Sequence, residues 1–202
     1  MNNLKQLGIA LHNYHDFYRS LPPAVVAGPD GKPMHSWRVL ILPFVEDAGL
    51  KQLHTRYDFK EPWNGPHNIQ LADKMPKVFA CPNDSNRQAS YLAVVGPETA
   101  WPGSNGIAFR GISDGTANTL MLVEVAESGI NWLEPRDLTF EQAAQGINIP
   151  EAKLGISSHH QGGAEFLFCD GSAHFLSDGI APDVLRSLLT AAGNDIVPIP
   201  DN

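Results

Sequence analysis

The sequence predicts an α+β fold, in which a helix at the start of the chain packs on an antiparallel sheet. Apolar residues recur every three or four positions near the start and form one stripe of a helix: Leu4, Leu7, Leu11, Tyr14 and Tyr18. Several short apolar runs farther along are bounded by Gly, Pro, Asn or Asp, as strands are. Strands and helices do not alternate in the regular βαβ order that a parallel sheet requires.

Composition indicates one folded unit spanning residues 1–202. The chain is 43% apolar and 18% charged, so it can bury a core. Its net charge is −8 and its 14 Lys and Arg residues are scattered, which excludes nucleic acid as a partner because phosphate binding needs clustered cations. No run reaches the about 18 consecutive apolar residues that span a bilayer.

The first half of the chain is expected to be helical and looped. Pro22 and Pro23 should end the first helix, and Ser36 is a good N-cap for a second one. Short helices are expected near 36–42 and 43–55, with Pro43 opening the latter.

The second half is expected to supply the sheet. Strands are predicted at 77–81, 90–96 and 119–126, the last two of them central. A short helix should begin near Asp137 or Thr139. A final helix should have Pro182 near its start and Gly193 as its stop.

The stretch HHQGGAEFLFCDGSAHF, residues 159–175, reads as a β-hairpin. Glu165, Leu167 and Cys169 alternate with Phe166 and Phe168, and a second alternating run begins at 173. Asp170-Gly171 between the runs suits a tight turn, where a positive φ is needed.

Two groups of residues could bind a metal ion or have a structural role. His159, His160 and Asp170 are candidate ligands for zinc or a related ion, although adjacent histidines on a strand point to opposite faces. Hydrogen-bonded structural histidines are the commoner case. Asp114, Thr116 and Asn118 offer alternating oxygens for calcium, but an Asx-turn explains them as well.

The two cysteines, Cys81 and Cys169, have neither a CxxC nor a Cys/His ligand spacing, so neither redox nor zinc chemistry is indicated. A disulfide and two buried thiols both stay open.

Signals for catalysis are weak. No serine lies in a GxSxG elbow and no Gly-rich phosphate loop is present. Glu124, within an apolar strand, is the acid whose burial is expected; it could pair with Asp170, but a structural hydrogen-bonding role is favoured. No cofactor is expected. The tryptophans, which could stack on carbohydrate, are more simply interpreted as loop anchors: Trp37, Trp63, Trp101 and Trp132.

Several blocks together resemble one bacterial family. They include NNLKQLGIALHNYHD, SWRVLILPFVE, FACPND, DGTANTLMLVEV with Glu124, NWLEPRDL with Trp132, and the H-x9-DG spacing from His160 to Asp170 and Gly171. The chain thus resembles the domain-of-unknown-function family with a C-terminal H-x9-DG motif, also labelled solute-binding family ten. The resemblance implies a prepilin-type N-terminus, whose membrane-spanning half of the first helix is missing from this chain, and a pseudopilin-like fold with long loop insertions.

The resemblance implies a non-enzymatic, pilin-like or pseudopilin-like protein of the cell envelope. Such a protein would be extracytoplasmic, anchored in the membrane by the missing helix, and a subunit of a secretion or filament assembly. Its partners would be other pilin-like subunits or secretion-system proteins. Two alternatives stay open. One is an extracytoplasmic module that binds a small solute or glycan through loop tryptophans. The other is a metal-dependent hydrolase that uses His159, His160 and Asp170.

Overall fold

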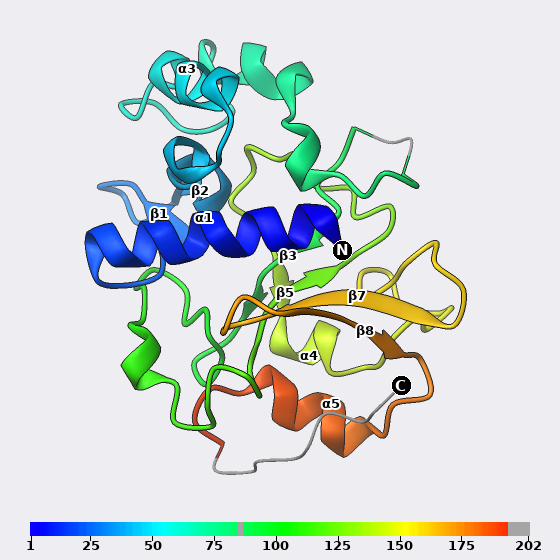
Figure 1. Ribbon diagram of the computed structural model, residues 1–202. Helices are drawn as coiled ribbons and strands as arrows, with labels where there is room; N and C mark the ends of the chain where they lie inside the picture. Colours follow the sequence, from blue (N-terminus) through cyan, green and yellow to red (C-terminus); the bar gives the residue numbers. More distant parts are fainter. Residues whose placement is uncertain (85–86, 194–202) are drawn as a thin grey trace.

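The structure, a computed structural model, describes residues 1–84 and 87–193 and has the predicted α+β architecture (Figure 1). The helices are α1 (Asn2–Tyr18), α2 (Trp37–Leu40), α3 (Ala48–Arg56), α4 (Phe140–Ala143) and α5 (Pro182–Leu189), with 3-10 turns η1 (Leu42–Phe44), η2 (Asn68–Lys74), η3 (Lys77–Phe79) and η4 (Phe109–Gly111). The strands are β1 (Val25–Ala27), β2 (Pro33–Ser36), β3 (Tyr91–Leu92), β4 (Val94–Val95), β5 (Leu120–Glu124), β6 (Leu138–Thr139), β7 (Gly163–Phe168) and β8 (Ala173–Ser177).

A four-stranded antiparallel sheet, in the order β3-β5-β7-β8, lies at the centre. Helix α1 crosses one side of it and α5 covers the other (Figure 1). Leu122, Leu167 and Cys169 belong to the core on the α1 side, while Val123 and Phe166 belong to the core on the α5 side. Both faces of the sheet are therefore buried. Two small pairs complete the strands: the antiparallel β1–β2 hairpin and the parallel β4–β6 pair.

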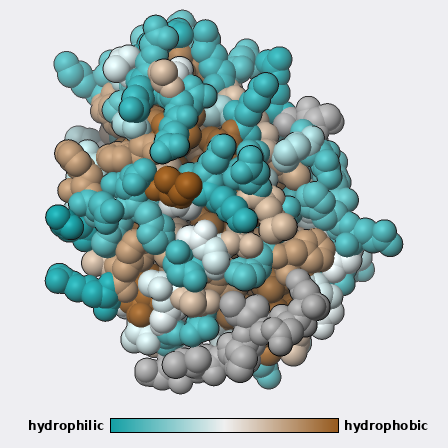
Figure 2. All heavy atoms as spheres, viewed as in Figure 1, coloured by the Kyte–Doolittle hydropathy of each residue, from teal (hydrophilic) through white to brown (hydrophobic). Residues whose placement is uncertain are grey.

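Helix α1 buries the predicted stripe except at its end. Leu4, Leu7 and Leu11 are fully buried, and Tyr14 is nearly so, whereas Tyr18 is 55% exposed. The helix ends where Arg19 takes a left-handed conformation with φ 63°, just before the two prolines. Its outward side is mostly hydrophilic in the space-filling view, with isolated apolar atoms (Figure 2). In the described residues, no helix combines the length and apolarity needed to cross a bilayer.

The short helices differ from the prediction only in where the second begins. The Ser36 side chain caps α2 by accepting a hydrogen bond from the Arg38 N–H, as predicted. Pro43 lies in the 3-10 turn η1, and α3 starts later because Asp47 caps it through the Gly49 N–H. The capping box of Thr139 and Gln142 starts α4 at the predicted place. Helix α5 begins at Pro182 but ends before Thr190, so Gly193 is not its immediate stop.

The strand predictions hold in part. The predicted strand at 77–81 is wrong, because its first residues form the 3-10 turn η3 after Pro76. The run at 90–96 splits into β3, an edge strand of the main sheet, and β4, which pairs with β6. Only the run at 119–126, as β5, is central as predicted. The split occurs at Ala93, whose N–H is bound by the carboxylate of Asp137 and not by a neighbouring strand.

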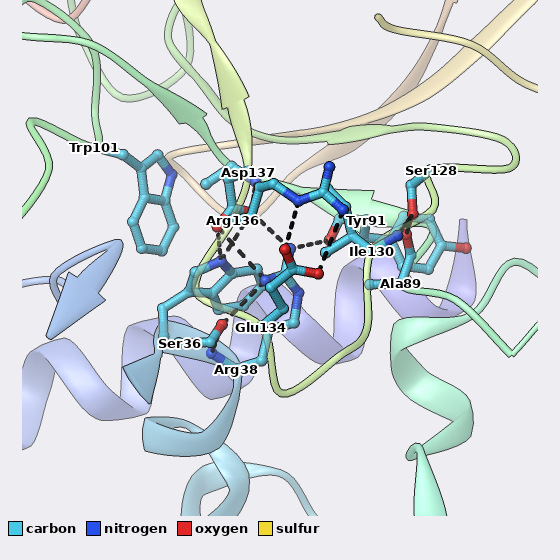
Figure 3. A network of polar contacts seen from close by, with 12 residues as sticks. Ser36, Arg38, Ala89, Tyr91, Trp101, Ser128, Ile130, Glu134, Arg136 and Asp137 are labelled. Carbon is cyan, nitrogen blue, oxygen red and sulfur yellow. Dashed lines mark hydrogen bonds and ion pairs between the residues drawn. The ribbon is translucent and has the colours of Figure 1, made fainter. Parts of the chain in front are cut away.

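A buried ion pair joins α2 to the segment before β6 (Figure 3). The Arg38 guanidinium donates to Asp137 Oδ1 at 2.6 Å, and both side chains are fully buried. The Trp37 indole N–H also donates to this carboxylate, and Arg38 donates to the carbonyl of Tyr91 in β3. Burial raises the pKa of the Asp137 carboxyl, whereas the Arg38 guanidinium opposes the rise. The network thereby fixes the edge of the main sheet.

Helix α1 packs closely against the hairpin formed by β7 and β8. A Cβ atom at Gly8 of α1 would lie 3.0 Å from Cδ1 of Leu167 and 3.6 Å from Cα of Gly171. One turn later, the His12 imidazole Nε2 lies 3.0 Å from the carbonyl oxygen of Cys169. Helix and hairpin therefore meet where the sequence has small residues on both sides.

Replacing Asp137 by Asn should destabilise the protein by about 3–5 kcal/mol, because the buried Arg38 would lose its counter-charge. Urea unfolding of both proteins measures this. Glu134→Gln is the control, since its partner Arg136 is 48% exposed, and it should cost at most about 1 kcal/mol. A similar loss of unfolding free energy in the two variants would show that the buried ion pair contributes no more than the exposed one.

Gly8→Val should destabilise the protein by about 1–3 kcal/mol, because its side chain would push α1 away from Leu167 and the hairpin turn. Asn13→Val places the same residue at an exposed position of the same helix and controls for helix propensity. Thermal or urea unfolding should separate the two variants. Equal effects would mean that the close contact contributes nothing.

Candidate functional site

The H-x9-DG spacing corresponds to the length of one strand. His160 precedes β7 and Asp170-Gly171 follows it, so the strand Gly163–Phe168 lies between them. Since a strand advances about 3.3 Å per residue, the two ends of the motif lie at opposite ends of the strand. The motif therefore has two separate sites, and His160 and Asp170 do not act together.

The Asp170-Gly171 end is a hairpin turn, as predicted. Gly171 has φ 86°, and the Asp170 carboxylate accepts a hydrogen bond from the Ser172 N–H at 2.8 Å. The Gly171 N–H donates to the Phe168 carbonyl. These contacts, with the nearby Gly8 of α1, give this end of the motif a scaffolding role.

The His160 end brings together side chains from three distant segments, which we call the Cys-Glu-His cluster: Cys81, Glu124 and His160. Nε2 of His160 lies 3.8 Å from Sγ of Cys81 and 3.8 Å from Oε1 of Glu124. All three donor atoms lie within 4.8 Å of one another. Glu165 adjoins the cluster, with its Oε1 3.9 Å from the same imidazole nitrogen.

Sheet register explains why the two acids meet. Glu124 ends β5 and Glu165 lies in β7, which pairs with β5 in antiparallel register. The Glu165 N–H donates to Oε2 of Glu124 at 3.0 Å, so one oxygen of this carboxylate is held and the other faces His160. The second oxygen of Glu165 forms an ion pair with the amino group of Met1.

The loop that carries Cys81 is tied to the first turn of α1. The side-chain amide of Asn3 donates to the carbonyl of Ala80 at 2.8 Å and to that of Lys77 at 3.2 Å. The imidazole Nδ1 of His160 lies 3.5 Å from the side-chain nitrogen of Asn83 in the same loop. The cluster therefore lies where the Cys81 loop, the two inner strands β5 and β7, and α1 come together.

Charge in the cluster is unfavourably distributed for a free thiolate. Burial, with the neighbouring Glu124 carboxylate, raises the pKa of the Cys81 thiol to about 11. Burial also raises the pKa of Tyr91, and the charges of Cys81, Glu124 and Glu165 add to this rise. Within the described part of the chain, the buried Tyr91 hydroxyl has no hydrogen bond of normal geometry.

Two sequence-based groupings are wrong. Among the described residues, the donors within reach of one ion are Cys81, Glu124 and His160, and this set includes neither His159, which is exposed, nor Asp170. Glu124 is buried, as predicted, but its acidic neighbour is Glu165 and not Asp170. Cys81 was missed because its distance from His160 along the chain matches no metal-binding pattern.

The second cysteine has no such role. Cys169 is fully buried under α1, and both cysteines are free thiols, which resolves the open alternative of a disulfide.

The suggested calcium loop has a structural explanation. Asp114 is 2% exposed, and its Oδ2 accepts hydrogen bonds from the Gly193 N–H and the Thr190 hydroxyl after α5. Asn118 donates from its side chain to the Asp114 carbonyl. The loop at 113–118 therefore anchors the end of α5, as a turn motif does.

Three of the four tryptophans are buried in the core. Trp37, Trp101 and Trp132 are at most 1% exposed, and Trp132 donates its indole N–H to the Ala72 carbonyl. Trp63 is half-buried and borders a groove of about 850 Å³ with Met34. The buried three cannot stack on a sugar.

Comparison with known proteins identifies the family of the chain. No curated protein and no solved structure matches the chain. The sequence profile of the family described as "Protein of unknown function (DUF1559)" matches residues 1–105 and 134–183, which include Cys81, His160 and the Asp170-Gly171 turn; Glu124 lies outside the matched segments. Because the match covers well over half of the chain, the protein belongs to the DUF1559 family.

Proposed function

We propose that this protein is a non-enzymatic, pilin-like or pseudopilin-like component of the cell envelope, a subunit of a secretion or filament assembly. The observation that carries the proposal is the placement of α1, which lies on an antiparallel sheet with one side buried and the other side free (Figure 1). A helix in this position can serve as a spine that packs on its own sheet and on neighbouring subunits. Membership of the family agrees with this reading because the resemblance implies a prepilin-type N-terminus.

Helix α1 leaves three apolar side chains exposed, one in its middle and two at its C-terminal end. Ile9 is 52% exposed, Phe17 is 71% exposed and Tyr18 is 55% exposed. Phe44 packs against the last two rings, with centroids 6.0 and 6.1 Å away. The exposed aromatic group at the end of α1, made of Phe17, Tyr18 and Phe44, is therefore a candidate surface for contact with another protein.

A groove borders this side of α1. It has a volume of about 690 Å³ and is lined by Ile9 and Gln6 of α1, by Leu50 and Leu53 of α3, and by Met75. In the proposed assembly, the neighbouring subunit packs over α1 and into this groove. Extracytoplasmic location and anchoring by an upstream apolar helix are part of the same proposal.

The proposal predicts that Ile9→Cys, in the full-length protein expressed with its natural upstream sequence, can be cross-linked between subunits in intact cells by a bismaleimide. Asp183→Cys, an exposed position on α5 across the sheet, is the matched control and should give mostly monomer. Gel analysis of the membrane fraction measures both. Monomer alone with Ile9→Cys, or a protein found only in the cytosol, would contradict the proposal.

A further inference from the structure

The Cys-Glu-His cluster has the composition of a transition-metal site. Thiolate, imidazole and carboxylate are the three side-chain groups that bind zinc, whereas calcium and magnesium require oxygen ligands alone. Here the three groups come from the loop after η3, from the end of β5 and from the segment before β7. Nothing in local sequence would bring them together, so only the fold creates this donor set.

The spacing of the donors fits one tetrahedral ion. Zinc bonds of about 2.0–2.3 Å place neighbouring donor atoms about 3.3–3.6 Å apart. The distances from His160 Nε2 to Cys81 Sγ and to Glu124 Oε1 are both 3.8 Å. The third pair, Cys81 and Glu124, is within the 4.8 Å that bounds all three donor atoms, so side-chain movements of about 1 Å would bring the three groups to one ion.

The surroundings of the donors are those of a prepared site. The Glu165 N–H holds one oxygen of Glu124, which leaves the other directed toward His160. The backbone N–H of His160 donates to the Ser158 hydroxyl, which fixes the chain at this residue. Such outer contacts orient ligands.

A neighbouring group is available for the fourth position. Oε1 of Glu165 lies 3.9 Å from His160 Nε2, on the same side of the sheet as Glu124. The hydroxyl of Tyr91, in register with Glu124 on β3, is a further buried polar group beside the cluster. A site with these ligands is closed by protein on most sides, as structural zinc sites are.

The competing interpretation is a nucleophilic cysteine activated by His160. A reactive cysteine lies in partly exposed, electropositive surroundings. Cys81 is only 3% exposed and has the carboxylates of Glu124 and Glu165 beside it. Cys81 therefore lacks the surroundings of a reactive cysteine, whereas its Sγ lies within 4.8 Å of donor atoms of both Glu124 and His160, as a shared ion requires.

We propose that Cys81, Glu124 and His160 form a structural binding site for a zinc-like divalent transition metal; Glu165, outside this set, would reach the fourth position by turning its side chain. The metal ties the Cys81 loop to β5 and to the start of β7. Because Asn3 binds the same loop, the metal also steadies the first turn of α1. This site does not depend on the envelope function and can be tested separately.

The test is metal content and cobalt spectroscopy of the untagged full chain. The wild-type protein, purified without chelator, should retain about one zinc per chain by elemental analysis. After chelation, added Co²⁺ should give the near-ultraviolet charge-transfer band of a cobalt–thiolate bond, and added Zn²⁺ should raise the Tm.

Two pairs of variants identify the ligands. His160→Ala should weaken zinc binding at least about 10-fold, whereas His159→Ala, at the exposed neighbouring position, should bind as the wild type does. Cys81→Ser should abolish the cobalt–thiolate band, and Cys169→Ala should keep it. Circular dichroism checks that each variant is folded.

The zinc content and the cobalt spectrum of the wild-type protein test the proposal even if a variant does not fold. Absence of both retained zinc and the cobalt–thiolate band in the wild-type protein would overturn the proposal. Equal loss of zinc in His159→Ala and His160→Ala would also overturn it. Rapid alkylation of Cys81 by iodoacetamide, unaffected by Zn²⁺, would favour the nucleophile instead.

Discussion

The close contact between α1 and the β7–β8 hairpin is the constraint on which the rest of the structure depends. It requires Gly8, because a Cβ atom there would lie 3.0 Å from Leu167. It also requires the tight turn at Gly171, whose backbone lies beneath the helix. Because α1 packs this close to the hairpin, the Asn3 side chain in its first turn can bind the Cys81 loop, and its apolar stripe covers the sheet. The helix, the H-x9-DG hairpin and the polar cluster are thus parts of one arrangement.

Local signals predicted much of the fold. The stripe of α1, the Ser36 cap, the start of α4 near Thr139 and the Asp170-Gly171 turn each depend on a few neighbouring residues, and the sequence predicts each of them. The failures were non-local. The run at 90–96 is one strand by composition, but Asp137, over forty residues later, binds the Ala93 N–H and divides it between two sheets. Propensity cannot reveal such a competitor.

The Cys-Glu-His cluster could not be predicted from the sequence for a related reason. Its members meet because of sheet register and because a loop without strand structure folds over the end of β5, and no spacing in the sequence encodes either. The sequence did indicate that Glu124 is buried and that His160 belongs to a motif. The partner acid is Glu165 because it lies beside Glu124 across two antiparallel strands, whereas Asp170 lies at the far end of β7. The nine residues between His160 and Asp170 therefore reflect the length of β7 and do not bring the two residues into one site.

The position of the cluster bears on what it can do. A buried carboxylate and thiol destabilise a fold unless their polar atoms are satisfied, and the same volume filled by apolar side chains would extend the core beneath α1. Glu124 keeps one oxygen hydrogen-bonded to the backbone and directs the other at His160. These two contacts reduce the cost of burying the carboxylate, and they also leave one oxygen oriented as a metal ligand would be. A cation there would neutralise the acids and join three segments at the end of α1. Because α1 is also the proposed spine, a metal at this point would stabilise the helix at the end nearest to any upstream segment.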